Sequence, residues 1–158
     1  MISTEYVAGT TPFIVRRRVK WGDCDPAGVV YTVTFGEYVL SAAELFYGHL
    51  FNGTPQRIKD AHGFGTPTRA LAFDFQASLW PDEEFDMRVT VEEVRTRTYT
   101  LRIAGSARGE PAFDARLTPI CVARGERRAI AVPDSLRDAL LSYQAACAQA
   151  DNNRSTRQ

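Results

Sequence analysis

The chain has 158 residues and a mass of 17.6 kDa, enough for one domain with a buried core and too short for two comfortable domains. Hydrophobic residues make up 44% of the sequence and charged residues 24%, as in ordinary globular proteins. Nineteen basic and nineteen acidic residues give a formal net charge of zero. This balance provides no electrostatic basis for binding nucleic acid or an anionic membrane surface.

The N-terminal sequence M-I-S-T-E-Y-V lacks a basic stretch followed by a long apolar run, and no later apolar run approaches a membrane span. We therefore expect a cytoplasmic protein. The three cysteines, Cys24, Cys121 and Cys147, do not have metal-ligand spacing, and His49 and His62 are the only histidines. We expect reduced thiols, no metal site and no cofactor.

The first predicted element is a strand over residues 13–21, which is rich in β-branched and aromatic residues. Alternation places Phe13, Val15, Val19 and Trp21 on one face of this strand. Arg17 falls on the same face, where it needs a partner or an exit to water, so we expect it near a sheet edge or an interface.

An acidic turn follows, with the sequence W-G-D-C-D-P-A-G-V-V-Y over residues 21–31. Pro26 biases Asp25 toward an extended backbone, and Gly28 can adopt conformations closed to other residues. The turn can therefore present Asp23 or Asp25 at the start of the next helix. Free N–H groups and partial positive charge at a helix start suit a carbonyl that gains negative charge during acyl transfer. We expect the chemistry here.

From Thr34 onward the apolar spacing becomes helical and ends near Gly48. Thr34 and Glu37 fit a capping box, which predicts that the helix begins at residue 33 or 34. Proline and glycine residues between Gly53 and Gly65 indicate a loop.

Four further strands are predicted by period-two alternation, with a short sixth strand left open near Ile130. R-G-E-P at residues 108–111 is typical of a hairpin turn. A second helix begins at Pro133 and extends through Tyr143, and the polar residues 151–158 are expected to form a loose tail. We assign residues 1–150 to a single domain. The four strands are predicted around residues 71–79, 85–91, 99–103 and 113–121.

The string G-D-C-D-P-A-G-V-V-Y, after a strand and before an apolar helix, resembles the hot-dog-fold acyl-CoA thioesterase family, and most closely its 4-hydroxybenzoyl-CoA thioesterase branch. G-T-P at residues 65–67 and G-E-R followed by A-I-A-V-P extend the resemblance over residues 13–132. It implies an α+β hot-dog fold, with a five- to six-stranded antiparallel sheet wrapped around one long helix. It also implies a homo-oligomer, a dimer or a tetramer, with sites between protomers.

In this resemblance Asp25 is the catalytic residue, either as the nucleophile or as the general base for a water. The thioester oxygen accepts a hydrogen bond from a backbone N–H at the start of the long helix, and the matching residue here is Thr32. Because T-V-T-F-G here replaces a Tyr-Pro-Asn type stretch, the N–H of the neighbouring Tyr31 is the alternative donor. Asp23 and Gly28 are expected to support the loop.

Substrate recognition is expected at two places. Members of the branch carry an acid on the long helix that meets a ring hydroxyl, and the matching position here is Leu40, or Ser41 in a shifted register. An apolar pocket there favours an unsubstituted or differently substituted aroyl group, although Glu37 and Glu44 could replace the acid.

Five arginines are candidates for the phosphates of coenzyme A. They are Arg95, Arg97, Arg124, Arg127 and Arg128.

The sequence therefore favours a thioesterase that hydrolyses a benzoyl- or hydroxybenzoyl-type CoA thioester to the acid and free CoA. One alternative is a thioesterase that releases polyketide or fatty acyl chains from a carrier protein. Another is a non-catalytic hot-dog protein that binds acyl-CoA, for which an intact Asp25 is unnecessary. A hot-dog hydratase is disfavoured, because neither His49 nor His62 is at the helix start.

Overall fold

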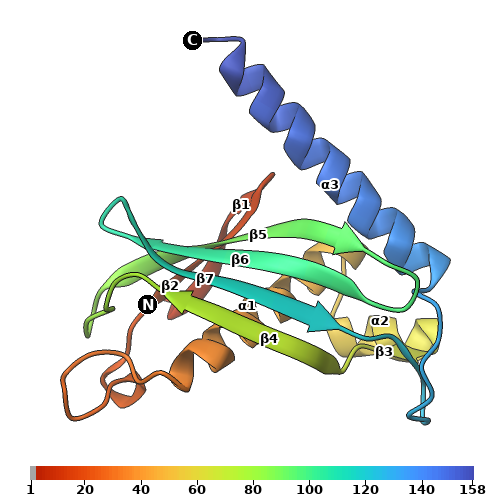
Figure 1. The fold of residues 1–158 in the computed structure, drawn as a ribbon, viewed down its shortest axis with the longest axis horizontal. Helices are drawn as coiled ribbons and strands as arrows, with labels where there is room; N and C mark the ends of the chain where they lie inside the picture. Colours follow the sequence, from red (N-terminus) through yellow and green to blue (C-terminus); the bar gives the residue numbers. More distant parts are fainter. Residues whose placement is uncertain (1–2) are drawn as a thin grey trace.

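The computed structural model describes residues 3–158 and has a six-stranded antiparallel sheet with the strand order β1-β2-β5-β6-β7-β4. Helix α1 (Thr34–Phe51) lies along one face of this sheet (Figure 1). The predicted α+β arrangement of a sheet around one long helix is confirmed. The strands are β1 (Glu5–Thr10), β2 (Phe13–Arg18), β4 (Thr68–Phe75), β5 (Glu84–Val94), β6 (Tyr99–Ala107) and β7 (Glu110–Pro119).

The core lies between the inner face of the sheet and α1. Aromatic side chains hold the two layers together: the ring centroids of Phe13 and Phe46 are 5.6 Å apart, and those of Tyr38 and Phe85 are 5.0 Å apart. All four side chains are buried. Burying a large apolar side chain stabilises a fold by about 1.5–3 kcal/mol, so this layer is a main source of stability.

The sixth strand is β1 at the N-terminus, so the position left open near Ile130 is wrong. Its mostly exposed sequence E-Y-V-A-G-T lacks clear alternation because β1 is an edge strand. Near Ile130 there is only an isolated bridge between Val122 and Ala129. A separate small sheet pairs β3 (Phe64–Gly65) with β8 (Val122–Ala123).

The structure decides two details of the first predicted strand, the partner of Arg17 and the exposure of Trp21. The guanidinium of Arg17 is buried and lies 2.8 Å from the Glu5 carboxylate, which is the acidic partner near a sheet edge that its position predicts. Trp21 was expected on the buried face, but it is 79% exposed. Strand β2 ends at Arg18, and Trp21 begins a short 3-10 turn (Trp21–Asp23), which breaks the alternation.

Helix α1 begins at Thr34 as predicted but continues past Gly48 to Phe51, where Asn52 takes a left-handed conformation with φ of 51°. The predicted capping box is absent. The Thr34 hydroxyl donates instead to the Asp23 carbonyl at 3.2 Å. The segment predicted as a loop contains helix α2 (Pro55–His62), which begins with a proline at its first position and buries no residue fully.

The last element, helix α3 (Asp134–Ser155), is longer than predicted. Its first half packs on the core through Leu136, Leu140 and Tyr143, whereas its second half projects away from the sheet (Figure 1). Residues 151–155, which were expected to belong to a loose tail, continue the helix with exposed side chains. The domain end placed at residue 150 falls within this helix. Within residues 3–158, none of the helices has the length and apolar character needed to span a membrane.

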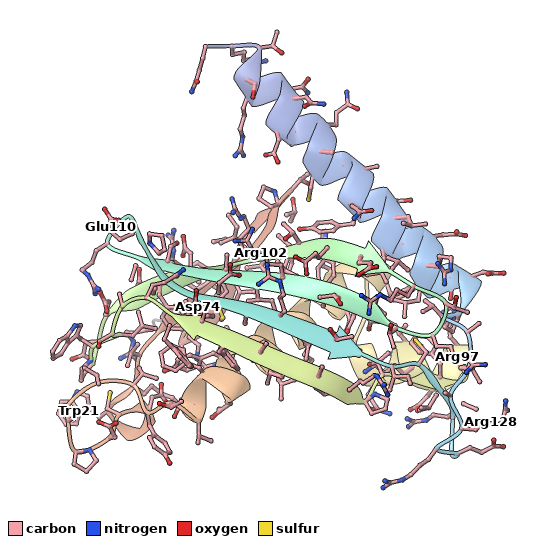
Figure 2. The ribbon with its side chains drawn as sticks, viewed as in Figure 1. Trp21, Asp74, Arg97, Arg102, Glu110 and Arg128 are labelled. Atoms are coloured by element: carbon pink, nitrogen blue, oxygen red, sulfur yellow. The ribbon has the colours of Figure 1, made fainter. Side chains whose placement is uncertain are left out.

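The two groups of predicted functional residues lie at opposite ends of the sheet. Figure 2 shows Trp21, which opens the acidic turn, at one end and Arg97 and Arg128 at the other. Strand β4 runs between these ends and has a free edge, because it pairs only with β7.

Candidate active site

Asp25 is held on a tight turn by its own backbone and by one carboxylate oxygen. Its Oδ1 atom accepts from the Ala27 N–H at 2.8 Å, and its carbonyl accepts from the Gly28 N–H at 2.9 Å. Gly28 has a φ of 86°, a left-handed conformation that favours glycine. The Asp25 Oδ2 atom has no hydrogen-bond partner among residues 3–158, so one oxygen remains available for a substrate or a water.

Asp23 is 7% exposed, and one of its carboxylate oxygens is bonded within the protein. Its Oδ2 atom accepts from the Tyr38 hydroxyl at 2.8 Å and from the Lys20 N–H at 2.9 Å. Its backbone carbonyl accepts from the Tyr31 N–H at 3.0 Å. Burial, followed by the hydrogen bond to Asp23, holds the pKa of Tyr38 well above its usual range, so the hydroxyl stays a donor. These bonds fit a residue that supports the loop.

The start of α1 offers two backbone N–H groups to a ligand. The Tyr31 N–H donates to Asp23 and is occupied. The N–H groups of Thr32 and Val33 have no acceptor within the described residues 3–158, as expected just before a helix. Of the two predicted donors, Thr32 is therefore free and Tyr31 is not.

Cys24 lies between the two acids but is poorly suited to nucleophilic chemistry. Burial raises the pKa of its thiol, and the charges of Asp23 and Asp25 raise it further. At neutral pH the thiol is therefore protonated, which makes Cys24 a poor nucleophile.

Tyr38→Phe is expected to lower the free energy of unfolding by about 1–2 kcal/mol, because Asp23 loses one hydrogen bond in a buried site. The loosened loop should also lower kcat severalfold. Tyr143→Phe is a matched control, since the Tyr143 hydroxyl is also buried and bonded, to the backbone of Phe13 and Val89. Urea unfolding and kinetics of both variants check this: equal loss of stability with equal loss of kcat would show no specific role for the Tyr38–Asp23 bond.

The two predicted acyl-pocket positions, Leu40 and Ser41, both line an open hollow along α1. The half-exposed Leu40 lines a cavity of about 310 Å³ between α1, α2 and the strands β4 and β7. The Ser41 hydroxyl donates to the Glu5 carboxylate on β1 at 2.6 Å. Lys59 and Thr66 also line this cavity, and sequence reasoning missed both. Pro55 directly after Thr54 was the available signal for the helix that carries Lys59.

Two of the predicted CoA-binding arginines, Arg97 and Arg128, lie at the end of the sheet opposite Trp21, the first residue of the acidic turn (Figure 2). Arg95, Arg124 and Arg128 form ion pairs with Glu93, Asp60 and Glu126. Arg97 and Arg127 have no acidic partner within 4.0 Å in the part of the chain that the structure describes. One protomer alone therefore does not bring the arginines and Asp25 together.

An antiparallel sheet around a long helix, with an acidic turn at the helix start, defines the class of hot-dog-fold thioesterases. Residues 19–140 match the family described as Thioesterase-like superfamily, and the chain belongs to this family. No curated protein sequence matches at a significant level.

Solved structures share the fold at low sequence identity. A thioesterase superfamily protein from Jannaschia sp. CCS1 is 23% identical, with a TM-score of 0.77, covering 90% of this chain and 97% of that one. A 1,4-dihydroxy-2-naphthoyl-CoA thioesterase from Synechocystis is 22% identical, with a TM-score of 0.73, covering 82% and 95%. An aspartate-to-asparagine mutant of 4-hydroxybenzoyl-CoA thioesterase, complexed with 4-hydroxybenzoyl-CoA, is 18% identical, with a TM-score of 0.70, covering 87% and 99%.

Proposed function

We propose that this thioesterase hydrolyses a CoA thioester of an aromatic acid, of the benzoyl or hydroxybenzoyl type, to the free acid and CoA. The observation that carries the proposal is that the acidic turn leaves one Asp25 oxygen free and the helix start leaves the Thr32 N–H free. The proposal is also supported by the family and by similar structures whose names include aroyl-CoA thioesterases.

In the proposed reaction the thioester oxygen accepts a hydrogen bond from the Thr32 N–H, and the positive end of the α1 dipole stabilises the negative charge that develops there. Asp25 then either attacks the carbonyl carbon or takes a proton from a water that attacks it. In both routes the carbon–sulfur bond breaks and CoA leaves as the thiol after protonation. Direct attack forms an aroyl–Asp25 anhydride that a second step hydrolyses. Mass spectrometry after rapid quenching distinguishes the routes, because only direct attack gives an aroyl-enzyme.

We also propose that the active form is a dimer formed through the free edge of β4, which could pair further into a tetramer. Large apolar side chains are exposed on and beside this edge, among them Leu71 at 38%, Phe75 at 45% and Leu40 at 47%. Because a two-fold pairing of β4 is antiparallel, it would set the Asp25 end of one protomer beside the cavity and arginine end of its partner. Each site would then combine both groups.

The test is a panel of CoA and acyl-carrier thioesters with release of the free thiol measured. We expect aroyl-CoA thioesters to give the highest kcat/KM. Preference for acyl groups on a carrier protein would favour the first alternative, and binding of acyl-CoA without hydrolysis would favour a non-catalytic protein.

Replacing Arg127 and Arg128 together by alanine is expected to raise KM for CoA thioesters while kcat stays within about twofold, because phosphate contacts far from the carbonyl contribute mainly uniform binding. Raising the salt concentration should have the same effect on the parent protein. Initial rates over a range of substrate concentrations measure both. If KM does not change in the double variant, the phosphates bind elsewhere, and Arg95 and Arg97 become the next candidates.

A further inference from the structure

The cavity beside Leu40 has an apolar wall and a polar end. Its volume of about 310 Å³ falls within the size range of small-molecule sites. Helix α1 and strand β7 supply the apolar wall, with Leu40, Ala43 and Leu117, and Pro119 follows on β7. The polar end is formed by α2 and the residues that follow β3. A ligand that fills this space would have a compact apolar body with a polar group at its far end.

Lys59 from α2 places a cation in this cavity without a counter-ion. Its ammonium lies 5.1 Å from the centroid of the Tyr47 ring, and the side chain is half-buried. Within residues 3–158, no carboxylate oxygen lies within 4.0 Å of it. Glu44 lines the same cavity, but its side chain is exposed and too distant for an ion pair. Burial lowers the pKa of Lys59, which reflects the cost of holding this charge without a close partner.

The same end of the cavity also contains the Thr66 hydroxyl. Its Oγ1 atom is buried and lies beside the hydroxyls of Tyr47 and Tyr99, which hydrogen-bond to each other at 2.5 Å. The Lys59 ammonium is therefore the group at this end that a charged ligand would meet.

We infer that Lys59 binds a carboxylate at the far end of the acyl group, so that the preferred substrate is the CoA monothioester of a compact dicarboxylic acid such as a benzenedicarboxylic acid. The inference rests on the proposed function. It requires a cation, which Lys59 provides, and an apolar wall for the ring. A phosphate of CoA offers the same oxygen chemistry, but it has no apolar body to fill the wall beside Leu40.

The test compares benzoyl-CoA with 3-carboxybenzoyl-CoA and 4-carboxybenzoyl-CoA in the parent protein and in Lys59→Met. Methionine keeps an apolar stem against Tyr47 and removes the charge. We expect the parent to prefer at least one carboxylated substrate by tenfold or more in kcat/KM. In Lys59→Met this preference should disappear, while kcat/KM for benzoyl-CoA stays within about threefold.

Arg57→Met is the matched control, because Arg57 is on the same helix but does not line the cavity. It should retain the full preference for the carboxylated substrate. Thermal unfolding of both variants shows whether either has lost its fold. Titration of the free benzenedicarboxylates against benzoate measures the same preference by calorimetry, and it does not depend on turnover.

Three results would overturn the inference. An equal rise in KM for all three thioesters in Lys59→Met would assign Lys59 to a CoA phosphate. Hydrolysis of aroyl-CoA thioesters by the parent without any preference for a carboxyl group would remove the role of Lys59 and leave the thioesterase proposal intact. Failure to hydrolyse any CoA thioester, together with equal binding of benzoate and the benzenedicarboxylates, would overturn both.

Discussion

Asp25→Asn is expected to lower kcat for the best CoA thioester by about a thousandfold or more, because a general base alone contributes about 10²–10⁴ and a nucleophile at least as much. An asparagine amide can neither attack the thioester carbonyl nor take a proton from water. The protein should still fold, since an asparagine side-chain oxygen can accept the hydrogen bond that Oδ1 of Asp25 accepts from the Ala27 N–H. Steady-state assays of CoA release and thermal unfolding measure the two quantities.

Asp138→Asn is a suitable control for the loss of one negative charge. Asp138 is exposed on α3 and belongs to no part of the proposed site. Its activity should equal that of the parent. The role of Asp25 would be disproved by a folded Asp25→Asn protein that keeps more than a tenth of the parent's kcat.

Introducing charge at the free edge of β4 is also expected to lower the activity strongly. In Leu71→Glu with Phe75→Glu, four apolar side chains are lost from a two-fold interface, and each contributes about 1.5–3 kcal/mol when buried. The dimer should then dissociate to a 17.6 kDa monomer at micromolar concentration. Activity should fall at least a hundredfold, because Asp25 and the partner's cavity no longer meet. Light scattering and CoA release measured on the same sample provide the comparison.

Leu141→Glu is the control for this experiment, because Leu141 is also exposed and apolar but lies on α3, away from β4. It should leave the oligomeric state and the activity unchanged. A parent protein that is a fully active monomer would contradict both the dimer and the shared site.

The acidic turn and the start of α1 were predictable because their signals are local. Pro26, Gly28 and the shift to helical spacing at Thr34 lie within a few residues of the features they indicate. Alternation likewise predicted strands β5, β6 and β7, which are buried on one face. Strand β1 and helix α2 were missed because neither buries a regular apolar face, so their sequences lack the periodic pattern that predicted the other elements.

The sequence by itself determined the fold class through the periodicity of its strands and helices, and the family through the motif around Asp25, which also led to the proposal that Asp25 is catalytic. Tertiary structure alone decided which groups are free to act. It joined the Tyr31 N–H to Asp23, left that of Thr32 open, and placed the Lys59 ammonium over the Tyr47 ring at the end of the cavity. Hydrogen-bond pairing and burial depend on which distant segments pack together, and no local pattern in the chain records this.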